Sequence, residues 1–187
     1  MGTYRGRDRA YVAQLLVPGR AWRGPMTDGA ECARVATPYG TVALGRVRSK
    51  VASHAVGGGL PEDWVFALDG APLARFRGLL FPPWHHAQVR TGLDATLDGT
   101  AYRVTGHRAL RPCRRAIRFD SAEPAAGFAI TGNSFRTRIT DATGTVLADK
   151  PAGWRVTTPT PRVLAAIAFH ELARLERFLT NPLLDLV

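Results

Sequence analysis

The chain has 187 residues, yet it holds only two lysines, two cysteines and two methionines. Lys50 and Lys150 are the two lysines among 25 basic residues, so arginine carries nearly all of the positive charge. With 15 acidic residues, the formal net charge is +10. Arginine forms bidentate contacts with phosphate and carboxylate that lysine cannot form. The charge therefore favours an anionic partner, while the abundance of Ala, Gly, Arg and Pro is also explained by a GC-rich, bacterial-type genome.

Several functional classes lack their usual signals. Cys32 and Cys113 have no metal-ligand spacing and are expected to be free thiols in a reducing compartment. The first apolar segment, residues 10–18, is too short and too interrupted for a signal peptide. We therefore expect a cytoplasmic protein, either free or peripheral at a membrane. Glycines 57–59 are not followed by the lysine of a phosphate-binding loop. The sequence thus predicts no metal, no cofactor and no catalytic residue.

Turn signals recur along the chain every eight to twelve residues or so, the spacing of an antiparallel β protein. Asp69-Gly70 and Asp98-Gly99 are the strongest two-residue hairpin signals, and Asp141 to Gly144 suits a type I turn followed by a left-handed glycine. Phe81 to Trp84 cannot form a central strand, because it contains two prolines. The predicted strands are residues 11–17, 32–37, 41–50, 64–68, 72–80, 87–97, 100–107, 114–119, 127–130, 134–140, 146–148 and 155–158.

The chain ends in one predicted helix, residues 161–179. Thr160 is a suitable N-cap, Pro161 fits the first helical position, and Asn181-Pro182 stops the helix. The run from Val163 to Phe169 is apolar on every side, as expected of a helix surrounded by protein or lipid. Seven residues are too few to span a bilayer, so protein must surround this run.

The second half of this helix carries charge on one face. His170, Arg174 and Arg177 lie opposite Leu172 and Leu175, so only the first two turns are expected to be enclosed. The predicted fold is a single, mainly β domain over residues 1–187. Its antiparallel hairpins form a barrel or strongly curved sheet packed on one C-terminal α-helix. The alternative is a helix packed on an open or sandwiched sheet.

These hairpins and the final apolar helix resemble the tubby C-terminal-like superfamily, which includes the LURP-one-related proteins and the phospholipid scramblases. The matching features are the Asp-x-x-Gly-x-x-Leu of Asp141 to Leu147, the two Asp-Gly hairpins, and the helix from Arg162 to Leu175. The resemblance implies a closed antiparallel barrel around a buried helix. It also implies acidic phospholipid at a membrane surface as the ligand.

An Arg-x-Arg pattern recurs on three predicted strands. Alternate residues of a strand point to the same side, so each pair is expected to share a face, outward, with Val47 and Phe76 directed to the core. Such rows would bind phospholipid headgroups or nucleic-acid phosphates. A solvated face with scattered counter-charges is the other interpretation. The predicted anion-binding residues are Arg46, Arg48, Lys50, Arg75, Arg77, Arg114, Arg115, Arg136 and Arg138, with Arg111 and Arg118 in the same cluster as Arg114 and Arg115.

The histidines give the best signal for an enzyme. His85 and His86 are adjacent, and adjacent residues on a strand point to opposite faces, so they cannot easily share a metal ion. The leading hypothesis is a non-enzymatic module that binds an anionic partner, most simply acidic phospholipid. The alternatives are a nucleic-acid or ribonucleoprotein-binding protein, and a small barrel enzyme of the cyclase or isomerase type. That enzyme would act on a hydrophobic substrate with His85, His86 or His107 as acid or base.

Overall fold

The structure is a computed structural model that describes residues 12–16, 29–49, 61–80, 85–133, 136–151 and 153–181. Several predictions lie outside these residues: the role of Lys50, the triglycine loop and the proline-rich stretch 81–84.

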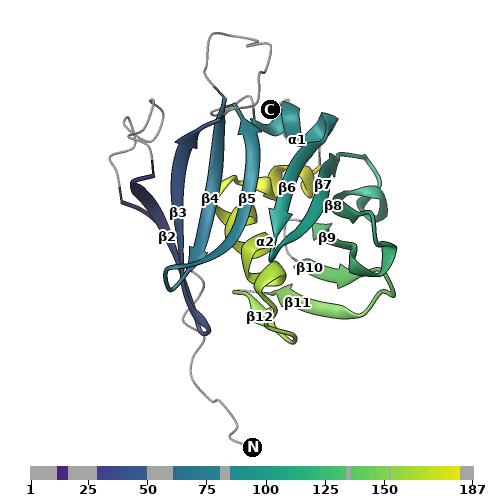
Figure 1. The fold of residues 1–187 in the computed structure, drawn as a ribbon. Helices are drawn as coiled ribbons and strands as arrows, with labels where there is room; N and C mark the ends of the chain where they lie inside the picture. The colour runs from purple at the N-terminus through teal and green to yellow at the C-terminus, as the bar shows by residue number, and fades with distance from the viewer. Residues whose placement is uncertain are drawn as a thin grey trace, which may run out of the picture.

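In the described residues, twelve antiparallel strands form one sheet in which each strand pairs with the next along the chain (Figure 1). The prediction of a mainly β fold built from antiparallel hairpins is therefore confirmed. The strands are β1 (Val12–Leu15), β2 (Glu31–Thr37), β3 (Gly40–Arg48), β4 (Glu62–Leu68), β5 (Ala71–Leu79), β6 (Leu93–Leu97), β7 (Thr100–His107), β8 (Ala116–Ser121), β9 (Phe128–Asn133), β10 (Arg136–Asp141), β11 (Val146–Lys150) and β12 (Arg155–Val156).

The hairpin turns form where the sequence places Asp and Gly. Asp69 and Asp98 adopt positive φ angles of 46° and 48°, and the glycine that follows each of them also has a positive φ angle. Positive φ at both central residues is the requirement of the type I′ turn, which matches the twist of the flanking strands. The neighbouring β2–β3 turn is fixed to this one, because the Thr41 amide donates to the Asp69 carboxylate at 2.9 Å.

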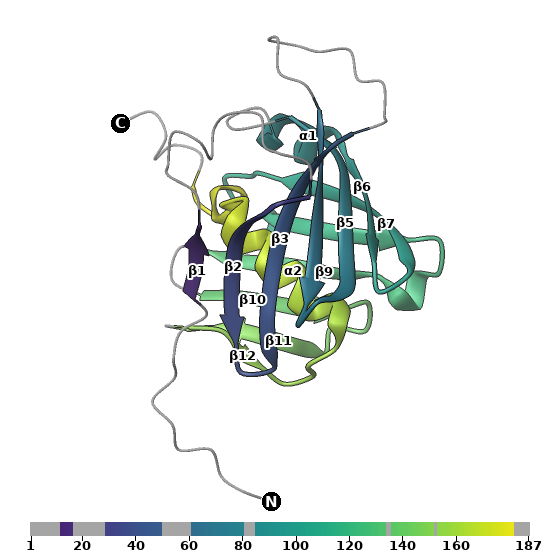
Figure 2. The ribbon, with the colours of Figure 1, turned by 60° about the vertical axis from the view of Figure 1, so that its left-hand side comes forward.

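The core of the molecule is the helix α2 (Pro161–Leu172), around which the sheet curves (Figures 1 and 2). Every residue from Val163 to His170 is buried, and Phe169 stacks on Phe76 of β5 at 3.8 Å between ring centroids. The prediction that only two turns are enclosed was wrong, since His170 is only 1% exposed. Pro161 occupies the first turn as expected, but the Thr160 side chain makes no capping hydrogen bond.

The predicted helix over 161–179 is broken in two. Arg174 adopts a left-handed conformation (φ 51°), and a 3₁₀ segment, η4 (Leu175–Phe178), follows. This break lets Leu175 and Phe178 both enter the core. Phe178 lies so close to β7 that a Cβ on Gly106 would be 2.5 Å from its ring.

The first half of the predicted strand 87–97 is instead the short helix α1 (His85–Thr91). Gly92 ends this helix with φ 109° and donates its amide to the Gln88 carbonyl at 2.8 Å. The Gln88 side chain also bonds the Gly78 carbonyl and the Leu80 amide, which holds α1 against the end of β5. A helix here was missed, although Gly92 is the usual residue at such an end.

The sheet is strongly curved but not closed. Among the described residues, β1 and β12 are its two edges and do not pair with one another. The β2–β3 turn still approaches β12, because the Tyr39 hydroxyl donates to the Val156 carbonyl at 3.4 Å. Within the described residues, no helix has the length and apolar character needed to cross a membrane.

Candidate anion-binding face

Arg46 does not lie on the outer surface as predicted. In β3 the inward side is set by Val42 and Leu44, and Arg46 continues that side, whereas Val47 is half-exposed. Its guanidinium is buried and bonds both carboxylate oxygens of Glu62 on β4, through Nε at 2.5 Å and Nη2 at 2.8 Å. Arg46 is therefore part of the core, and the outward orientation predicted for it was wrong.

The pair on β5 keeps the predicted geometry but loses part of its charge to a neighbour. Arg75 and Arg77 are exposed on either side of the buried Phe76. Arg75 donates to the carboxylate of Asp63 on β4 at 2.6 and 2.8 Å. Burial alone would raise the pKa of Asp63, but bonds from Ser49, Gly78 and Arg75 outweigh it and lower the pKa. Because Arg75 is paired with Asp63, Arg77 is the better candidate on β5 for contact with an external anion.

Arg115 is likewise structural. It is 5% exposed and donates to the carbonyls of Ala109 at 2.7 Å and Leu110 at 2.6 Å. A third bond reaches the Leu179 carbonyl at 3.3 Å, which ties the β7–β8 connection to the chain that follows η4. Its donors point at carbonyls inside the protein, so the prediction that it binds an external anion was wrong.

Outward-facing arginines gather instead on strands β8 and β10. Arg118 lies between the buried Ile117 and Phe119 on β8, so it points away from the core. Arg136 is exposed and Arg138 half-buried, on either side of the buried Thr137. We call Arg114, Arg118, Arg136 and Arg138 the arginine face; Arg114 comes from the 3₁₀ segment η2 (Pro112–Arg114), directly before β8.

The register places the members of this face close together. On β9, Ala129 lies opposite Arg118 and Thr131 opposite Arg138. Only one strand separates the two arginines, and they are offset by two residues along it, so their backbones lie roughly 12 Å apart. By contrast, β5 and β10 are five steps apart in the strand order, about 24 Å. The predicted Arg-x-Arg rows therefore do not form one contiguous surface.

The guanidinium groups of the arginine face have no carboxylate partner among the residues that the structure describes. Within the described part of the chain, none of the four makes an ion pair or a side-chain hydrogen bond, in contrast to Arg34, Arg75 and Arg103. Asp149 on β11 does lie opposite Arg138 in the register, without an ion pair between them. Among the described residues, this part of the surface thus offers guanidinium groups that no carboxylate contacts directly.

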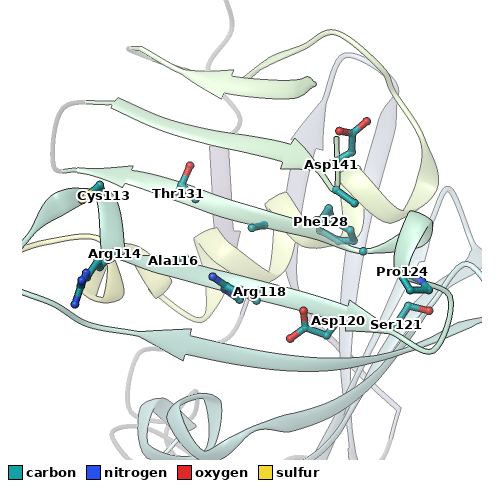
Figure 3. A pocket seen from close by; sticks show the side chains of 13 residues that line it. Cys113, Arg114, Ala116, Arg118, Asp120, Ser121, Pro124, Phe128, Thr131 and Asp141 are labelled. Atoms are coloured by element: carbon teal, nitrogen blue, oxygen red, sulfur yellow. The ribbon is translucent and has the colours of Figure 1, made fainter. Parts of the chain in front are cut away.

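A groove of about 390 Å³ lies on the outer side of β8 and β9, beside this face (Figure 3). Arg114, Arg118, Asp120 and Asp141 line it, together with the hydroxyl groups of Ser121 and Thr131. Sequence reasoning singled out the arginines but not the groove. From the sequence, Asp141 was assigned to a turn and Asp120 was given no role.

A second polar cluster, also missed from the sequence, lies where α2 meets the last hairpin. One carboxylate oxygen of Glu171 accepts from Lys150 at 2.6 Å, Trp154 at 2.9 Å and His170 at 3.1 Å. Burial would raise the pKa of Glu171, but the bonds from His170 and Lys150, together with Trp154, outweigh it and lower the pKa to about 2. Because side chains of the protein itself provide these donors, we interpret the cluster as a structural link between α2 and β11.

His86 and His107, two of the candidate acid or base residues, take structural or isolated positions. His86 bonds the Ala173 carbonyl through Nε2 at 3.1 Å and packs edge-on against Phe178. Burial lowers its pKa. His107 is exposed at the end of β7. Across the described residues, no group of three or more His, Cys, Asp or Glu side chains could hold a metal ion.

No protein-family model, curated protein or solved structure matches this chain.

Proposed function

We propose that the protein is a non-enzymatic module that binds acidic phospholipid at a membrane surface through the arginine face. The observation that carries the proposal is the set of outward guanidinium groups on β8, β10 and η2 without carboxylate partners in the described residues. Each arginine near an acidic membrane surface contributes about 1 kcal/mol of attraction. A strand meander around a C-terminal helix also supports the proposed kinship with tubby-like proteins.

An exposed leucine favours a lipid surface over nucleic acid. Leu110 is 64% exposed in the turn that leads into η2, beside the exposed Arg111. Arg115 holds this turn through the carbonyls of Ala109 and Leu110. An apolar side chain among arginines suits the headgroup region, where it enters the acyl boundary while the cations contact phosphates. Nucleic-acid phosphate offers no such environment.

The test is vesicle binding by matched charge variants. Arg118→Gln/Arg138→Gln should weaken binding to vesicles containing phosphatidylglycerol by about 2 kcal/mol, roughly thirtyfold. Arg34→Gln/Arg90→Gln removes the same charge from exposed sites on β2 and α1 and should bind nearly as the wild type does. Binding should also weaken steeply when the salt concentration rises from about 50 to 200 mM. The reason is that salt screens the attraction between exposed arginines and phosphates over about one Debye length.

Three results would contradict the proposal. The first is vesicle binding that does not change with ionic strength. The second is an equal loss of vesicle affinity in both double variants. The third is RNA binding with steep salt dependence in a protein that does not bind lipid vesicles. The last would assign the arginine face to nucleic-acid phosphates instead.

A further inference from the structure

The groove beside the arginine face separates charges of opposite sign. Figure 3 shows Arg114 toward one end, Asp120 and Asp141 toward the other, and Arg118 between them. A site for a simple anion needs no carboxylates, because they would repel it. The lining therefore fits a ligand that carries both a negative and a positive group.

Arg118 and Asp120 point into the groove from the same strand. Arg118 and Asp120 are two residues apart on β8, both outward, at a spacing of about 6.7 Å along the strand. They do not pair with each other, and in the described part of the chain neither bonds any other side chain. Both groups are thus available to a ligand.

Asp141 is held ionised and in place by its own turn. Its Oδ1 accepts from the Thr143 hydroxyl at 2.7 Å and from the Thr143 and Thr145 amides at 2.9 Å each. These bonds, that from the Thr143 side chain first, lower its pKa. A fixed carboxylate at the groove's end supplies a defined position for a cation.

We propose that this groove binds the headgroup of an aminophospholipid, with the phosphate against Arg114 and Arg118 and the primary ammonium against Asp120 and Asp141. The inference rests on the proposed membrane function and names the lipid class. A primary ammonium has three N–H donors for the two carboxylates, whereas the choline ammonium has none. A free phosphoethanolamine has the same chemistry, so the test separates the two sources.

The decisive comparison uses phosphatidylserine and phosphatidylglycerol at equal mole fraction in phosphatidylcholine vesicles. Both lipids carry one net negative charge, but phosphatidylserine adds an ammonium group and a carboxylate. An arginine could also bind that carboxylate, so the Asp120→Asn variant is needed to isolate the contribution of the ammonium group. The wild type should prefer phosphatidylserine about three- to fivefold, the range of an exposed ion pair. Asp120→Asn should remove this preference without weakening binding to phosphatidylglycerol. Asp94→Asn, an exposed strand aspartate outside the groove, should retain it.

Calorimetry with soluble phosphoethanolamine identifies the source. Weak binding of the soluble compound beside strong, serine-selective vesicle binding supports the lipid headgroup. Tight binding of soluble phosphoethanolamine, lost in Asp120→Asn, with no vesicle binding supports the groove's chemistry but overturns the membrane function. Equal affinity for the two lipids, or a preference that survives in a folded Asp120→Asn protein, overturns the headgroup site while the proposed function stands.

Discussion

Arginine takes three distinct roles at three positions of this chain. Arg46 pairs with Glu62 inside the core, Arg115 bonds three carbonyls, and Arg118 stands free on the surface. Residue type alone does not separate these roles. Arg46 and Arg118 differ in the side of the sheet to which their strands direct them, whereas Arg115 lies between η2 and β8. Lysine cannot replace Arg115, since a single ammonium cannot reach carbonyls that the planar guanidinium spans.

Glu171 is the residue whose charge state should govern acid stability. Its folded-state pKa of about 2 lies below its usual 4.5, so its contribution is present above pH 4.5 and lost as the pH falls toward 2. The loss should be on the order of 3 kcal/mol. Chemical denaturation across this pH window measures it.

Glu171→Gln should remove most of that pH dependence and lower stability at neutral pH, because Lys150 then lacks its carboxylate partner. Glu176→Gln, an exposed carboxylate on η4, provides the control and should change neither. An unchanged acid transition in Glu171→Gln would contradict the assignment.

At the scale of elements, the docking of η4 depends on a missing side chain. Gly106→Ala would place a methyl group 2.5 Å from the Phe178 ring, so one of them must move. We expect a destabilisation of about 1–3 kcal/mol, as for other overpacked cores. Thermal or denaturant unfolding measures the change.

A double-mutant cycle tests the cause. Phe178→Leu removes the ring, so Gly106→Ala should cost clearly less in that background. An equal loss of stability in both backgrounds would show that the destabilisation arises within β7 and not from contact with η4.

The elements that the sequence predicts best are those with local signals. Asp69-Gly70 and Asp98-Gly99 specify their turns through positive φ angles that few residue pairs accept. The break at Arg174 has no such signal, because arginine seldom adopts the left-handed conformation and does so here to bury Phe178. Tertiary packing decides that break.

The candidate site was predictable only in part, for a similar reason. The Arg136/Arg138 row follows from strand alternation, and both members do point outward. The inward side of β3 and the neutralising Glu62 and Asp63 on β4 follow from register and burial, which the pattern of single strands does not fix. The groove depends on residues from β8, β9 and the β10–β11 turn, brought together only by the curved sheet.

For the whole molecule, the open sheet raises the question of whether its edge unfolds separately. Cys32 on β2 is fully buried, and burial raises its pKa to about 11. In Cys113→Ser, which removes the exposed thiol, Cys32 should react with a thiol reagent only through global unfolding, because it faces the core that α2 fills. Its labelling rate should then depend on denaturant as steeply as equilibrium unfolding does. A shallow dependence would mean that β1 and β2 detach locally.

The helix at the centre of the molecule follows every strand of the described sheet in chain order. During synthesis, the apolar sides of these strands must therefore leave the ribosome before the segment that covers them. Until then the nascent chain exposes surfaces that promote aggregation, so we expect productive folding to wait for translation of α2 and to benefit from chaperones that shield the earlier strands.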